Sequence, residues 1–233
     1  MALNINKADH KTAYSLARAI GQAIGGDRGH IIERSLEGNV NPEQMVRAFH
    51  AFYDVPAPSE YTELTPERLA MRIGLVLEEF GEFLFKAMGI SMEVRFEVGN
   101  TNDQQEVMED LNRRRLVEII PKARFFDPVE GSDAAGDSVY VWFGLMIEMG
   151  ISLMPVLREI HAANMTKPGE DGSVLRRLDG KVMKGPYYME PNIAQVLSAC
   201  MNRGLTSSDY SELHQRDAIS TDGLESRHPG AES

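Results

Sequence analysis

The segment that most constrains the fold is the apolar stretch Met71–Met88, MRIGLVLEEFGEFLFKAM, which carries three glutamates within five residues. Thr65-Pro66 precedes it, and a threonine cap followed by proline is typical of the start of a helix. In a helix, Glu78, Glu79 and Glu82 lie three and four positions apart and project to one side. The sequence therefore predicts a long helix with an acidic face.

Apolar residues flank this acidic face as well as lining the opposite one. The main apolar stripe comprises Leu69, Ile73, Val76, Leu77, Phe80, Leu84 and Ala87. Leu75, Phe83 and Phe85 lie beside the glutamates, where a solvated face would seldom carry them. We expect the helix to be covered on both sides and its carboxylates to be partly buried. Lys86 can pair with Glu82, but one lysine cannot neutralise three acids, and buried carboxylates must be paired, protonated or bound to metal. The alternative is an ordinary solvated acidic face.

A second acidic cluster lies in the segment 128–149, PVEGSDAAGDSVYVWFGLMIEM. Glu130, Asp133 and Asp137 follow one another at intervals of three and four, which places them on one helix face. Small residues between them allow another helix to approach closely. Asp137 precedes a segment that is apolar on nearly every side, so its carboxylate requires a partner. We expect this cluster to face the glutamates of the first helix; the alternative is a solvated helix start, where Glu130 complements the helix dipole.

Four or more carboxylates from two helices make a hard oxygen site. Such a site suits Mg²⁺ or Mn²⁺, which prefer carboxylate and water ligands. Histidine and cysteine are absent from both clusters, which argues against zinc. The expected metal ligands are Glu79, Glu82, Asp133 and Asp137.

The remaining chain is also mainly helical in pattern, which predicts an all-α fold, a helical bundle with a minor strand or hairpin element. Further helices are expected over 8–24, 42–53, 104–120, 127–149, 154–165 and 193–201, with a strand over 91–98 and a loop and hairpin over 167–191. Residues 1–40 form an N-terminal helical extension in this interpretation, 41–201 the main domain, and 202–233 a loose polar tail.

Composition excludes several classes of protein. The formal charge of −11 over 233 residues argues against binding to nucleic acid, which needs basic patches. It permits a small anionic substrate held through a metal. No apolar run is long enough to span a bilayer, and the first twenty residues lack the apolar core of a signal peptide. Cys200 is a single cysteine, so no internal disulfide is possible and a reducing cytoplasm is expected.

Taken together, these motifs resemble the MazG-like superfamily of all-α nucleoside triphosphate pyrophosphohydrolases, whose hallmark is EExxE on one helix and ExxD on the next. Glu78-Glu79-Phe-Gly-Glu82 matches the first element, and Asp133-Ala-Ala-Gly-Asp137 with Ser-Val-Tyr140 matches a DxxxDxxY form of the second. If Asp137 is the ExxD aspartate, Ala134 stands where the family has glutamate, and Asp133 or Glu130 would substitute. Alternatively, Glu130-Gly-Ser-Asp133 is itself the ExxD element.

Two downstream segments extend the resemblance. His161-Ala-Ala-Asn164-Met-Thr-Lys167 is similar to an HxxNMxK segment of phage and bacterial members that also resemble phosphoribosyl-ATP pyrophosphohydrolase. The segment 179–188, DGKVMKGPYY, is similar to their DGKVxKGPxY. Donors and positive charge there fit the far side of a metal-bound polyphosphate. The expected substrate-binding residues are Asn164, Lys167, Lys181, Lys184 and Tyr187, each of which has a solvated surface residue as its alternative, and for His161 we favour a structural role.

The resemblance implies hydrolysis of a (deoxy)nucleoside triphosphate to the monophosphate and pyrophosphate, with Mg²⁺ or Mn²⁺ bridging the phosphates. Glu78 or Glu130 is the expected general base. It also implies a homodimer or homotetramer, with sites at or near subunit interfaces. A phage nucleotide-pool enzyme acting on dGTP or GTP, as in the MazZ-type branch, is one expectation, with the host cytoplasm as its location; phosphoribosyl-ATP is the runner-up substrate. The competing class is a non-catalytic nucleotide-binding helical regulator, which Ala134 favours.

Overall fold

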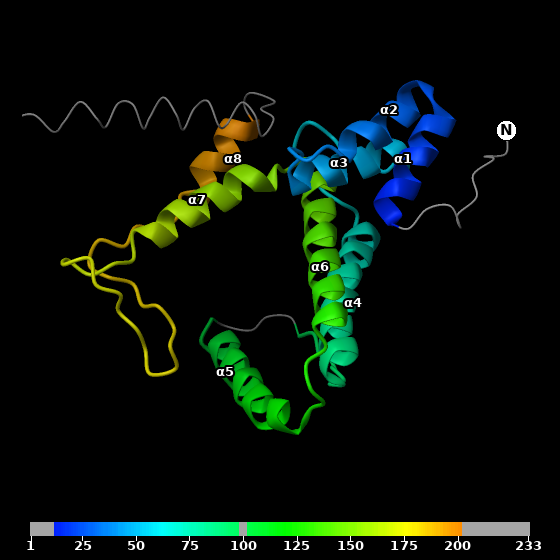
Figure 1. Cartoon of the computed structure of the whole chain (residues 1–233). Coiled ribbons are helices and arrows are strands. Elements are labelled where there is room, and N and C mark those ends of the chain that lie inside the picture. The colour runs from blue at the N-terminus through cyan, green and yellow to red at the C-terminus, as the bar shows by residue number, and fades with distance from the viewer. Residues whose placement is uncertain (1–11, 98–101, 202–233) are drawn as a thin grey trace, which may run out of the picture. The chain divides into compact units, whose positions relative to one another are not determined.

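The computed structural model of the chain describes residues 12–97 and 102–201, which form helices joined by loops (Figure 1). The helices are α1 (Ala13–Ile24), α2 (Gly26–Ser35), α3 (Pro42–Phe52), α4 (Pro66–Met88), α5 (Asn102–Ile119), the 3₁₀ turn η2 (Ile120–Lys122), α6 (Pro128–Glu148), α7 (Leu153–Met165) and α8 (Ile193–Met201). The predicted all-α class is confirmed. The chain divides into two compact units, one made of residues up to Glu63 and from Met146 onward, the other of Leu64–Leu145.

The first unit begins with three consecutive helices. The helix expected over 8–24 is present from Ala13, and residues 8–11 lie outside the described part of the chain. Thr12 caps its N-terminus, and Gly25, with φ of 61°, ends it. A helix was not predicted at α2, whose sequence GDRGHIIERS has two glycines and a weak apolar periodicity. It packs against both α1 and α3.

A buried carboxylate joins α3 to the start of α7. The Asn41 cap and Pro42 start predicted for α3 are confirmed. Glu43, only 1% exposed, accepts hydrogen bonds from the Ser152 hydroxyl at 2.8 Å and from the Met154 amide at 3.1 Å. Its other oxygen pairs with Arg47 at 3.0 Å. One side chain therefore satisfies orphan donors at the N-terminus of α7 and fixes that helix on α3.

The end of the first unit consists of α7, α8 and the loop between them. Val156 and Val196 are buried between these two helices. The Glu159 carboxylate also accepts the Asn192 amide at 2.8 Å, just before α8 begins. Within the loop, an isolated antiparallel bridge joins Arg176 and Val182. This confirms the hairpin element, which consists of that one bridge and not of two full strands.

The second unit contains α4, α5, η2 and most of α6. The Asp127 amide donates to the Ala87 carbonyl at 2.9 Å, so the first turn of α6 meets the last turn of α4. The Phe83 and Phe126 rings pack at 5.9 Å between centroids. The predicted Thr65 cap and Pro66 start of α4 are confirmed.

Two sequence-based expectations in this unit are wrong. Residues 91–97 are not a strand, and residue 98 lies outside the described part. No strand with which this segment could pair occurs among the residues described here. A single strand is not stable alone, so the alternating sequence does not produce one. Nor does the single chain cover α4 on both sides. Leu84 and Ala87 are buried, but Phe80 and Phe85 are 46% and 58% exposed.

Within the described ranges, no single helix is long and apolar enough to cross a membrane. The helices α6 and α7 meet that criterion only as a pair, and the pair is bent by 116°.

Candidate active site

The acidic residues of α4 lie along its C-terminal half. Glu78 is exposed, whereas Glu79 and Glu82 are half-buried. The predicted pairing of Lys86 with Glu82 is confirmed, because the Lys86 Nζ lies 2.6 Å from the Glu82 Oε2. The acidic face of α4 is thus partly shielded from water, as its flanking apolar residues led us to expect.

The acidic residues of α6 lie in its first three turns. Asp127 precedes the helix, and its Oδ1 accepts the amides of Val129 and Glu130 at 2.9 and 3.2 Å. Asp133 and Asp137 are exposed, and Glu130 is half-buried. Ala134, which occupies the position of the family glutamate in one register of the motif, is 2% exposed, so its face of α6 packs into the protein. Ala134 lies four residues after Glu130 and three before Asp137, so it is next to the acidic stripe on the same side of α6.

The acidic residues of α4 and α6 are close enough for their charges to affect one another. Burial raises the pKa of Glu79 most, and the charges of Asp137, Glu82 and Glu78 raise that pKa further. Asp137 of α6 therefore lies within electrostatic range of the α4 glutamates. At the next turn, hydrogen bonding to Glu82 raises the pKa of Lys86, and the carboxylates of Glu130 and Asp133 add to that effect. The ammonium group of Lys86 is therefore within electrostatic range of carboxylates from both helices.

The C-terminus of α4 is held by a residue that sequence reasoning missed. The Arg124 guanidinium donates to the Phe85 carbonyl at 2.9 Å and also to the Lys86 carbonyl. The Arg124 amide donates to the Met88 carbonyl at 3.2 Å. A cation at the carbonyl end of a helix complements the dipole and satisfies orphan acceptors. Arg124 therefore fixes the turn that carries Glu82 and Lys86. No sequence signal identifies it, because it lies 38 residues from Lys86 along the chain.

The donor set fits a divalent cation in charge and in ligand type. The Glu79 Oε2 is buried and has no hydrogen-bond partner in the structure, which is a costly state for a carboxylate oxygen unless a cation binds it. The side chains of this acidic donor set are not already close enough together to coordinate a metal ion, however. Within residues 12–97 and 102–201, no group of three or more histidine, cysteine, aspartate or glutamate side chains is close enough to hold a metal ion.

The expected substrate-binding residues lie in the first unit, on α7 and the loop after it. Asn164 is exposed near the end of α7, as is His161. Lys181 is exposed in the hairpin, and Tyr187 is 66% exposed. The carboxylates and the basic residues are therefore assembled separately, each group within its own unit.

Lys167 and Lys184 are brought together on one aromatic ring. Their Nζ atoms lie 5.9 and 4.3 Å from the centroid of Tyr188, which is half-buried. Lys184 also pairs with Glu190 at 3.0 Å. Sequence reasoning singled out Tyr187 and missed Tyr188 and Glu190, although Tyr188 is the next residue of the same motif.

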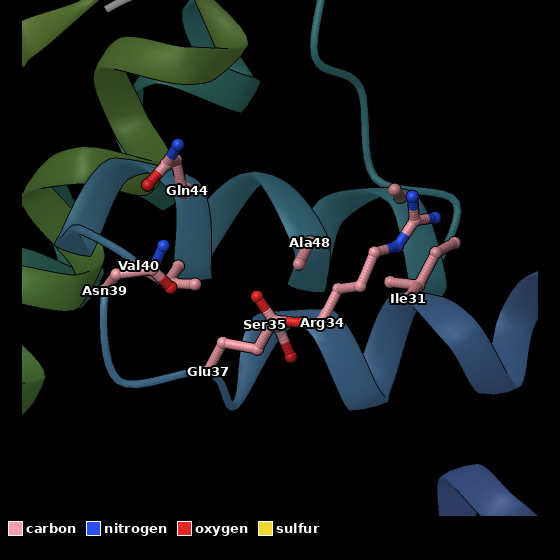
Figure 2. A pocket seen from close by; sticks show the side chains of 9 residues that line it. Ile31, Arg34, Ser35, Glu37, Asn39, Val40, Gln44 and Ala48 are labelled. Carbon is pink, nitrogen blue, oxygen red and sulfur yellow. The ribbon is translucent and has the colours of Figure 1, made fainter. Parts of the chain in front are cut away.

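A pocket between α2 and α3 contains none of the predicted site residues. It has a volume of about 360 Å³ (Figure 2). Two of its polar side chains already serve the local fold: Gln44 completes the Asn41 cap, and the Ser35 hydroxyl donates to the Ile32 carbonyl. This pocket contributes nothing to the candidate active site.

Comparison with known proteins identifies the family. The family model described as phosphoribosyl-ATP pyrophosphohydrolase matches residues 46–164, slightly more than half of the chain, including both acidic stripes. The chain belongs to this family, within the MazG-like all-α superfamily, and is a pyrophosphohydrolase.

Comparison with solved structures and curated proteins adds little. The crystal structure of a "putative NTP pyrophosphohydrolase" from Exiguobacterium sp. 255-15 is 24% identical, and the match covers 70% of this chain and 95% of that one. The TM-score between the two structures is 0.30. Among curated proteins, no match was found.

Proposed function

We propose that this protein hydrolyses (deoxy)nucleoside triphosphates to the monophosphate and pyrophosphate, using Mg²⁺ or Mn²⁺ held between α4 and α6. The observation that carries the proposal is the buried, unpartnered Oε2 of Glu79, a carboxylate within electrostatic range of Asp137. Glu79, Glu82, Asp133 and Asp137 would hold the cation. When bound, it would neutralise phosphate charge and acidify the attacking water.

The other residues have roles that follow from their chemistry. Glu78, which is exposed on α4, accepts the proton of the attacking water, with Glu130 as the alternative base. Asn164, Lys167, Lys181, Lys184 and Tyr187 bind the phosphates and the nucleoside. With alanine at position 134, the ligands on α6 would come from Glu130, Asp133 and Asp137, which lie on one side of the helix. The presence of Glu79, Glu82 and Asp137 is the feature that argues against a non-catalytic regulator.

The second part of the proposal concerns which nucleotide the enzyme prefers as its substrate. A deoxynucleotide-pool enzyme of phage type acting on dGTP or GTP in the cytoplasm fits the downstream motifs. Phosphoribosyl-ATP is the second candidate, and the description of the matching family favours it. Both substrates carry a triphosphate-derived anhydride, so the same carboxylates and lysines would serve either reaction.

Exposed apolar side chains support a homodimer or homotetramer. On α4 and α6 of the second unit these are Leu69, Met71, Ile73, Phe80, Phe85, Val129, Val139 and Trp142. Apolar exposure of this kind on the two helices that carry the acidic stripes is typical of an interface. We therefore place the active sites at or near subunit contacts. Light scattering coupled to size exclusion would measure the mass, and a monomer would contradict this part of the proposal.

The decisive experiment measures pyrophosphate release from a panel of NTPs, dNTPs and phosphoribosyl-ATP, with Mg²⁺, with Mn²⁺ and with EDTA. We expect release only with metal, and a loss of at least roughly a hundredfold in Glu82→Gln and Glu79→Gln. Glu67→Gln is the matched control, because it removes the same charge from the exposed first turn of α4. Tight nucleotide binding without turnover would favour the regulator instead.

A further inference from the structure

The loop between α7 and α8 is closed at its base by hydrogen bonds. The Gly185 amide donates to the Lys167 carbonyl at 2.9 Å, and the Met189 amide donates to the Thr166 hydroxyl at 2.9 Å. A Cβ at Gly185 would collide with the Pro168 carbonyl oxygen, so only glycine permits this approach. The two ends of the loop, 166–168 and 184–190, therefore lie against each other.

This closure gathers two lysines around one tyrosine. The Tyr188 amide donates to the Gly185 carbonyl at 3.1 Å, which turns the chain so that its ring lies near both ammonium groups. Lys184 lies 4.3 Å and Lys167 5.9 Å from the ring centroid, within the range of a cation–π interaction. Two cations on one ring repel each other, so the arrangement favours binding of an anion that bridges them.

Glu190 supplies a carboxylate to this cluster. Its Oε1 lies 3.0 Å from the Lys184 Nζ, and its side chain is 78% exposed. An exposed ion pair of this kind is worth little, so a dianionic phosphate group can replace the carboxylate. The hydrogen bond that Lys184 donates to Glu190 also raises the pKa of Lys184.

We propose that Tyr188 holds Lys167 and Lys184 in place as a binding site for the pyrophosphate portion of the substrate, and that Glu190 occupies this site until the substrate displaces it. Tyr188 is thus a positioning residue that acts through the two lysines. The inference rests on the proposed function in one respect, that a polyphosphate is the substrate.

Direct binding of inorganic pyrophosphate to the full chain, measured by calorimetry in EDTA, tests the inference without turnover. We expect Tyr188→Leu to bind roughly five- to tenfold more weakly, and Tyr188→Phe to retain most of the affinity, because phenylalanine also attracts cations. We expect Glu190→Gln to bind roughly threefold more tightly, because a competing charge is removed. Glu170→Gln, on the same loop and exposed, is the matched control for that loss of charge and should bind like the wild type.

Each outcome decides the inference. If the wild type binds no pyrophosphate, or if Glu190→Gln binds no more tightly than Glu170→Gln, the inference is overturned. If Tyr188→Leu fails to fold, which thermal unfolding would reveal, the Glu190→Gln and Glu170→Gln pair decides alone. Because metal is absent, these results are independent of the pyrophosphate-release assay. Binding that behaves as expected, without metal-dependent release, would overturn the proposed function and leave this site standing.

Discussion

The Lys86 Nζ lies 2.6 Å from the Glu82 Oε2, and the same ammonium group is within electrostatic range of the Glu130 and Asp133 carboxylates. A lysine thus takes part in the cluster where a divalent cation is proposed to bind. Any cation that binds there must share or displace this interaction, because both positive charges would compete for the same carboxylates.

Lys86→Gln is therefore expected to bind Mn²⁺ roughly two- to fivefold more tightly than the wild type, the range set by an exposed ion pair. Calorimetry in a buffer of low ionic strength measures the affinity. Lys122→Gln, at an exposed lysine in the η2 turn of the same unit, removes the same charge and is the control, which should have no effect. Equal or weaker Mn²⁺ binding by Lys86→Gln would show that the lysine does not compete with metal.

Arg124→Ala is expected to lower the free energy of unfolding by about 1 kcal/mol, because the last carbonyls of α4 lose their cationic cap. Urea unfolding followed by circular dichroism measures this change. Arg115→Ala, an exposed arginine on α5, is the control. We also expect Arg124→Ala to weaken Mn²⁺ binding, since the turn bearing Glu82 is no longer fixed. A destabilised variant with unchanged Mn²⁺ affinity would restrict Arg124 to a structural role.

Glu43→Ala is expected to be much more costly. It leaves the Ser152 hydroxyl and the Met154 amide without their acceptor and removes the partner of Arg47. Breaking a buried ion pair in this way costs about 3 kcal/mol or more. Urea unfolding of this variant beside Glu37→Ala, an exposed glutamate before α3, makes the comparison. Similar stabilities for the two variants would mean that α7 does not depend on this contact.

The features that could be predicted from the sequence depend on residues that are close together along the chain. The caps at Asn41 and Thr65 and the spacing of acidic residues in α4 and α6 depend only on neighbours within one or two turns. The helix α2 was missed because glycines and charges obscure its periodicity, and helix-to-helix packing on α1 and α3 stabilises it instead. The segment 91–97 shows the opposite error, since alternation alone does not provide a partner strand.

The parts of the site that escaped prediction depend on the path of a loop. Arg124 reaches α4 from beyond α5, and Tyr188 meets Lys167 only because Gly185 lets the loop close. Neither contact has a fixed spacing in the sequence. The sequence could therefore nominate Lys167 and Lys184 by resemblance, but not the ring and the carboxylate that surround them.

The reactivity of Cys200 gives a test that is independent of the active site. Burial raises the pKa of its thiol, and the Glu43 carboxylate adds to that effect. At pH 8.5 the folded protein therefore carries less thiolate than an ordinary cysteine, and we expect alkylation by iodoacetamide to be slower than in urea by roughly tenfold, since only the thiolate reacts.

The stability that the neutral thiol contributes is fully present below its ordinary pKa of 9.0 and is lost as the pH rises toward the raised value in the folded protein. Mass spectrometry of the alkylated protein over pH 7–10 measures the profile, with Cys200→Ser as the blank. Equal rates in the folded and urea-unfolded protein would contradict the burial of Cys200 beside α7.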